Sequence, residues 1–230
     1  MTVTEAARVD ERAAAQGSAA RQRLDGWTFV LWSAVVLIPA MALAAANWTD
    51  DLGLVPWITT AGLGLGALLV ISRFHGRAAF LLGVGYGLVI LLWRLTDTLD
   101  PGMGWRERAI DLAARVATFV TVVLAGEPSR DSLMFVLAMG IAFWGMAVLG
   151  TWWVFRRGGL WLAVLLPGLA VFLNVYYSRY GSRLQIYLPA FLLVALALIV
   201  RTELSGRRRG WELRRAQVSS DVSSRITQAG

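Results

Sequence analysis

Apolar residues run in long, uninterrupted stretches along this chain, and short polar segments separate the stretches. Each stretch is close to the roughly 20 residues that a helix needs to cross a bilayer. The pattern therefore predicts an all-α fold, a polytopic bundle of transmembrane helices. We place six spans at Trp27–Ala46, Leu54–Ser72, Ala78–Leu95, Leu133–Phe155, Leu160–Tyr177 and Ile186–Val200.

A further helical pattern lies between the third and fourth spans. Apolar residues recur there at spacings of four and three, which is typical of one helix face: Trp105, Ala109, Leu112, Val116, Phe119 and Val123. Arg108, Asp111 and Arg115 lie on another face and can pair. The uncharged part, from Val116 onward, is too short to span. We expect an amphipathic helix over about residues 104–125, on the extracytoplasmic membrane surface or packed across the bundle mouth. The alternative is a tilted seventh span, which would move the C-terminus outside.

Composition supports a multi-pass membrane protein. Of the 230 residues, 57% are hydrophobic and 16% are charged, and the mean hydropathy is +0.59. A soluble domain of this length could not bury so much apolar surface. The chain divides into a polar tail (residues 1–26), a six-span membrane domain (27–200) and an Arg-rich tail (201–230).

The distribution of charge predicts the orientation. The two tails and the short turns after the second and fourth spans carry Arg, whereas the connection 47–53 carries Asp50 and Asp51 and no Arg. Cytoplasmic loops are enriched in basic residues, so both termini are expected in the cytoplasm of a bacterial cell, with the chain in the plasma membrane. The same explanation accounts for the net charge of +7 without nucleic acid. Arg207, Arg208 and Arg209 suggest contact with anionic lipid headgroups, although a topology anchor explains them equally well.

Residues that could carry chemistry are few. The chain has no cysteine, and its one histidine, His75, lies in a short turn flanked by Arg. These facts exclude disulfides and thiolate catalysis within the chain, and they disfavour histidine-based metal sites. No nucleophile stands beside an evident base. We expect no catalytic, metal or cofactor-binding residue, and hence a protein that is not itself an enzyme.

The letters VGYG at residues 84–87 match part of a potassium-channel filter. A filter is an extended loop between pore helices, but these residues lie inside an apolar run. Gly83 and Gly87 are four residues apart, and so are Gly62 and Gly66. That spacing lets two helix backbones approach closely. We therefore interpret the four glycines as helix-packing positions.

Asn174 is the most interior strongly polar residue of the spans. Two interpretations remain open. The amide could help to bind a ligand or an amide-bearing lipid headgroup, or it could make an interhelical hydrogen bond near a span end, which we favour.

The order of features resembles the N-terminal membrane domain of bacterial transglutaminase-like membrane proteins. The resemblance covers roughly Trp27 to Arg225 and rests on patterns of Trp, Arg and apolar residues. These are LLWRLTD at the end of the third span, the insert opening with Trp105, RDSLMFVLAMGIAFWGMAVLGTWWVFRRGGLWLAVLLPGLAVFLNVYYS, YLPAFLLVALALIVRTEL, and the Arg-rich tail with Trp211.

In that family the membrane domain precedes a further span and an extracytoplasmic papain-like domain with a Cys-His-Asp arrangement. The present sequence reaches Gly230 without a Cys, so no catalytic residue of the family can be assigned here. We expect either part of a longer parent or a stand-alone membrane module. The resemblance implies an anchoring or scaffold role. The alternatives are an accessory subunit that packs against other membrane subunits and a small transporter or channel subunit.

Overall fold

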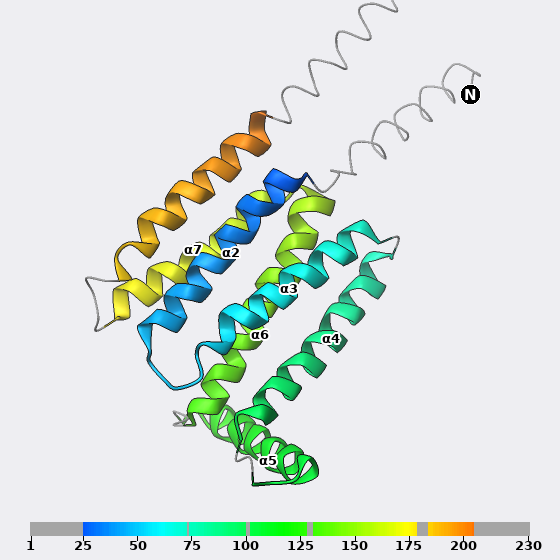
Figure 1. The fold of residues 1–230 in the computed structure, drawn as a ribbon, viewed down its shortest axis with the longest axis vertical. Helices are drawn as coiled ribbons and strands as arrows, with labels where there is room; N and C mark the ends of the chain where they lie inside the picture. Colours follow the sequence, from blue (N-terminus) through cyan, green and yellow to red (C-terminus); the bar gives the residue numbers. More distant parts are fainter. Residues whose placement is uncertain (1–24, 73, 100–101, 128–130, 179–183, 205–230) are drawn as a thin grey trace, which may run out of the picture.

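The computed structural model describes residues 25–72, 74–99, 102–127, 131–178 and 184–204. These residues form helices joined by short turns (Figure 1). The helices are α2 (Gly26–Ala46), α3 (Leu54–Ile71), α4 (Gly76–Asp97), α5 (Trp105–Leu124), α6 (Ser132–Trp152), the π-helix η1 (Trp153–Arg157), α7 (Leu160–Tyr177) and a helix over Tyr187–Leu204. The all-α fold class is therefore confirmed. Arg207, Arg208 and Arg209 lie outside the described residues.

Six of these helices are long and apolar enough to cross a membrane. They are α2, α3, α4, α6 continued by η1, α7 and the Tyr187–Leu204 helix. The predicted bundle of six spans is therefore confirmed in number, and the helix ends fall within a few residues of the predicted limits. α5 is not one of the six.

α6 is the central helix of the bundle. It contacts α2, α3, α4, α5 and α7, and its contact with α3 is the most extensive between any two labelled helices. In Figure 1, α3 and α4 lie on one side of α6 and α2 and α7 on the other, with the Tyr187–Leu204 helix at the far edge. Three clusters of buried apolar side chains fill the spaces between these helices.

Both ends of α6 have specific local causes. At its start, the Asp131 carboxylate accepts a hydrogen bond from the Leu133 N–H at 3.0 Å, which satisfies one of the free donors of the first turn. At its end, α6 widens into η1, which stops at Gly158 with φ +68°. Glycine tolerates this left-handed conformation, so the chain can turn directly into α7.

The described chain starts and ends on the same side of the bundle. Arg201, near the end of the last helix, donates to the Asp25 carboxylate before α2, at 2.7 Å from Nη2 to Oδ2. α5 lies at the opposite end, roughly across the directions of the spans (Figure 1). The structure therefore agrees with the interpretation of α5 as a helix packed across the bundle mouth.

The predicted apolar stripe of α5 is only partly buried. Leu112 is buried, and Val116 and Phe119 pack against the same cluster, but Trp105 is 78% exposed. The charged face also meets the bundle, because Arg108 donates to the Thr96 carbonyl near the end of α4 and Arg115 donates to Asp131 at the start of α6. Hydrophobic spacing alone could not show this, since the polar ends of neighbouring helices attract the charged face.

Candidate functional site: the contacts around α6

The predicted packing glycines of α3 lie directly on α6. A β-carbon added to Gly62 would lie 2.9 Å from the Ala147 Cβ, and one added to Gly66 would lie 2.9 Å from the Thr151 Cβ. Both distances are shorter than real carbon contacts, so any larger residue would force the helices apart. The absence of side chains at these two positions permits the close approach of α3 to α6.

The predicted packing glycines of α4 lie on the adjoining face of α6. A β-carbon at Gly83 would lie 3.0 Å from Val148 Cγ1, and one at Gly87 would overlap the indole nitrogen of Trp144. That nitrogen, Nε1, donates a hydrogen bond of 2.9 Å to the Gly83 carbonyl oxygen. Gly87 thus provides the space through which the indole reaches a backbone acceptor on α4.

The VGYG letters belong to this same helix. α4 runs without interruption from Gly76 to Asp97. Gly85 has no atom within 4 Å of an added β-carbon, and Tyr86 is exposed on the outer side of α4. The backbone here is helical, so its carbonyls bond within the helix and do not line a filter.

Sequence reasoning missed the contribution of α6 itself. Gly140 packs under Leu91 and Ile58, and Gly150 packs under the ring of Trp32. Trp32 Nε1 donates to Thr151 Oγ1 at 2.8 Å in the buried interior. The available signal was the presence of tryptophan in the middle of a span, because a buried indole N–H requires an acceptor.

Arginine side chains close the two ends of the α3–α4–α6 region. Arg156 in η1 donates from Nε to the Val70 carbonyl at 3.2 Å and from Nη2 to the Ser72 carbonyl, so it satisfies free acceptors at the end of α3. At the opposite end, the Arg94 guanidinium lies 4.5 Å from the ring centroid of Trp57. Such cation–π contacts suit amphipathic side chains at a membrane surface.

The Asp25–Arg201 pair ties the last helix to the first. Arg201 bonds to the Asp25 carboxylate through Nε and Nη2, and the Thr28 hydroxyl donates to the same carboxylate at 2.8 Å. The hydrogen bond from Arg201, followed by that from Thr28, lowers the pKa of Asp25 below 3.8. The pair is half exposed, so its contribution to stability is small.

Asn174 lies on the buried face of α7 with Ala163, Pro167 and Val171. It is 3% exposed, and neither its Nδ2 nor its Oδ1 hydrogen-bonds within the described part of the chain. The interhelical hydrogen bond that we favoured is therefore not formed. α2, which packs against α7, offers few polar groups: its buried side chains are apolar except for Thr28, in its first turn, and Trp32, whose N–H is bonded to Thr151.

Charged residues of α5 meet the start of α6. Arg115 donates from Nε to Asp111 Oδ2 at 2.9 Å and from Nη1 to Asp131 Oδ2 at 3.4 Å. The hydrogen bond to Asp111 raises the pKa of Arg115 above its already high ordinary value. Arg108 does not join this group as predicted, and instead donates from Nε to the Met103 carbonyl at 3.0 Å.

Together these residues build a site of close helix packing. Among the described residues, no group of three or more His, Asp or Glu side chains could hold a metal ion. Comparisons with known proteins add no assignment: no family model, curated protein or solved structure matches the chain.

Proposed function

We propose that this chain is a non-catalytic, multi-span membrane scaffold that anchors and positions a partner. The observation that carries the proposal is the dense α3–α6–α4 contact, in which glycines on three helices meet buried side chains and Trp144 bonds to the Gly83 carbonyl. Interlocking of this kind holds helices at fixed positions. A module built in this way supplies a rigid frame in the bilayer.

The outer helices offer the surfaces on which a partner could assemble. α4 and the Tyr187–Leu204 helix lie at opposite edges of the bundle (Figure 1). Their outward faces carry large exposed apolar side chains, among them Phe80, Leu81, Val89, Leu193 and Leu196. Lipid covers such faces in a lone bundle, and a neighbouring span can replace the lipid.

Purification from native membranes tests the scaffold proposal. The chain is extracted in a mild detergent, and its mass and composition are measured in the complex. Under the scaffold proposal, we expect the chain to fold without a partner and, in native membranes, to be bound to a partner or joined to a further domain. A partner present in fixed stoichiometry, without which the chain does not fold, would instead establish an accessory subunit. Transglutaminase or protease activity of the chain alone would contradict its non-catalytic character.

The relation to transglutaminase-like envelope proteins is part of the same proposal. Its support is the order of spans with an inserted helix that opens at Trp105. The DNA on either side of this coding segment tests it. A frame that continues into another span and a domain with Cys, His and Asp would support the relation, and a stop codon with no such domain encoded nearby would overturn it.

We also propose that both termini lie in the cytoplasm of a bacterial cell, with α5 outside. Arg77, Arg156 and Arg201 all lie at the end of the bundle where α2 starts. Because the chain has no cysteine, single cysteines report topology cleanly. Asp50→Cys should react with an impermeant thiol reagent in intact cells, whereas His75→Cys should react only after permeabilisation. The opposite labelling pattern would reverse the orientation.

A further inference from the structure

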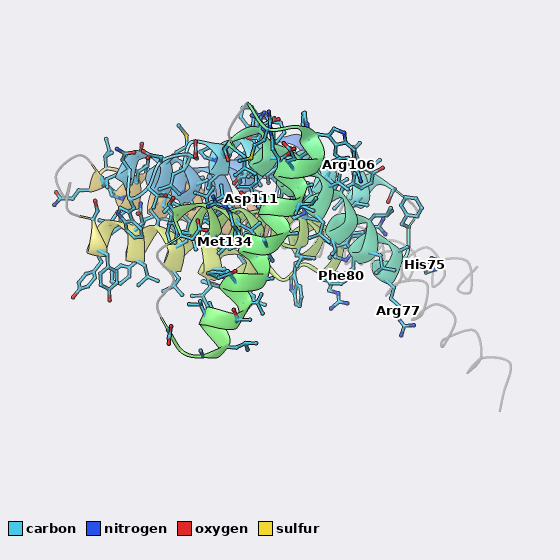
Figure 2. All side chains as sticks on the ribbon, turned by 90° about the horizontal axis from the view of Figure 1, so that it is seen from below. His75, Arg77, Phe80, Arg106, Asp111 and Met134 are labelled. Atoms are coloured by element: carbon cyan, nitrogen blue, oxygen red, sulfur yellow. The ribbon has the colours of Figure 1, made fainter. Side chains whose placement is uncertain are left out.

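α5 reaches beyond the bundle that it closes. Figure 2, seen from the α5 end, shows the helix crossing the spans and continuing past their edge. The part that continues carries no charge between Arg115 and Glu127. Val120, Val123 and Leu124 are exposed on it, Leu124 to 81%. In a bilayer, a helix that overhangs the spans at this level has lipid beneath it.

A hollow of about 210 Å³ lies between this overhang and the start of α6. Its lining residues are Ala114, Arg115, Thr118, Phe119, Val122, Asp131 and Met134. The charged groups come from Arg115 and Asp131, and the apolar wall comes from Phe119, Val122 and Met134. An occupant must therefore present charge on one side and hydrocarbon on the other, as an amphiphile does.

The charged side of the hollow carries both signs, with Arg115 and Asp131 in its wall and Asp111 beside it, bonded to Arg115. Arg115 uses Nε for Asp111 and Nη1 for Asp131, which leaves the N–H groups of Nη2 for a further acceptor. The two carboxylates and the guanidinium are 29% to 43% exposed, so a ligand can reach them. A phosphate suits the guanidinium, and a primary ammonium, with its N–H donors, suits the carboxylates.

We propose that this hollow binds one phospholipid whose zwitterionic headgroup ends in a primary ammonium, as in phosphatidylethanolamine. The phosphate lies at Arg115 and the ammonium at Asp131 and Asp111. The first part of an acyl chain lies under the α5 overhang, against Phe119, Val122 and Met134. An anionic headgroup would bring a second negative charge toward a cluster of two carboxylates and one guanidinium, and a choline headgroup lacks N–H donors. The site does not depend on the scaffold function, because it requires only that the bundle is inserted in a membrane.

Lipid selectivity of the unchanged chain is the first test. The purified full chain in detergent is titrated with phosphatidylethanolamine, phosphatidylcholine and phosphatidylglycerol of identical acyl chains, and bound lipids are counted by native mass spectrometry. We expect one ethanolamine lipid to bind about tenfold more tightly than either of the others. Equal binding of the three lipids, or a preference for phosphatidylglycerol, would overturn the proposal. Soluble phosphoethanolamine should not displace the bound lipid, and its doing so would contradict the acyl-chain contact.

Two sets of variants locate the site. Asp111→Asn combined with Asp131→Asn removes the negative charge, and asparagine still caps α6. We expect the tenfold preference to disappear, while Asp97→Asn, a matched change on the same side of the membrane outside the hollow, retains it. Ala114→Trp fills the hollow and should lower occupancy without changing the helix content seen by circular dichroism. Retention of the preference in both the double variant and Ala114→Trp would place the lipid elsewhere.

Discussion

Two regions of the same bundle differ in whether their buried polar side chains are hydrogen-bonded. Around α6, the indole of Trp144 bonds to the Gly83 carbonyl and that of Trp32 bonds to the Thr151 hydroxyl. On α7, the amide of Asn174 is as deeply buried, yet it has no hydrogen-bond partner among the described residues. The three side chains are buried to a similar extent, and they differ in whether a hydrogen-bond partner lies beside them.

The comparison shows what glycine provides in a membrane bundle. At Gly87 the missing side chain leaves room for the Trp144 ring, and that ring then reaches an acceptor on the neighbouring helix. On α7, the other residues of the buried face are Ala163, Pro167 and Val171, and none of them has a polar side chain that could pair with Asn174. Around α6, close packing and polar pairing therefore arise together, whereas the buried amide on α7 has no partner among the described residues.

The largest effect should come from filling the space at Gly87. Gly87→Leu places a side chain where Trp144 now lies and breaks its bond to Gly83, so we expect a loss of about 3 kcal/mol. Gly85→Leu is the matched control, because open space surrounds that position on the same helix. Thermal unfolding in detergent compares the two variants. Equal stability of both would contradict the packing role of Gly87.

A smaller loss should follow removal of the acceptor of Trp32. Thr151→Val keeps the shape of the side chain but leaves the Trp32 N–H unpaired, and we expect a loss of about 1 kcal/mol. Combining Thr151→Val with Trp32→Phe removes donor and acceptor together. Unfolding measurements on both single variants and the double variant give the coupling between the residues, and additive losses would show that the bond contributes nothing.

The unpaired amide predicts a gain of similar size. Asn174→Leu replaces a buried polar group that lacks a partner with an apolar side chain that branches at the same carbon, so the bundle should become more stable by about 1 kcal/mol. The denaturation midpoint in detergent measures this gain. Leu173→Ala, at an exposed position of the same helix, provides a reference for changes on the lipid side. A less stable Asn174→Leu protein would show that the amide has a favourable interaction in the membrane.

The smallest expected effect is the loss of stability at low pH through the Asp25–Arg201 pair. The pKa of Asp25 is lowered by Arg201, so the contribution of the pair is complete above 3.8 and is lost as pH falls through the lower folded value. The pair is exposed, so the loss should stay below about 1 kcal/mol. Unfolding temperatures measured from neutral pH down to this acid range should decline less in Asp25→Asn than in the unchanged chain. Parallel declines would exclude a role for the pair.

The number and approximate limits of the spans could be predicted from the sequence, because membrane insertion requires long apolar helices and uncharged runs reveal them directly. The packing role of the glycines on α3 and α4 could be predicted as well, because each pair is four residues apart and so lies on one helix face. Their shared partner, α6, could not be predicted, because one helix pattern does not specify which neighbour it meets. The inward charged face of α5 was missed for a related reason, since Asp131 and the end of α4 attract that face only in the folded bundle.

The hydrogen bonds of α6 also bear on the order of events during synthesis. Trp32 lies 119 residues before Thr151 and Gly83 lies 61 residues before Trp144. The first three spans are therefore made while the acceptor for one indole and the donor for one carbonyl are still missing. Until α6 is made, α2, α3 and α4 have only their contacts with one another and lack these two hydrogen bonds. A nascent chain arrested before α6 should accordingly hold these spans loosely, and release past residue 157 should lock them together.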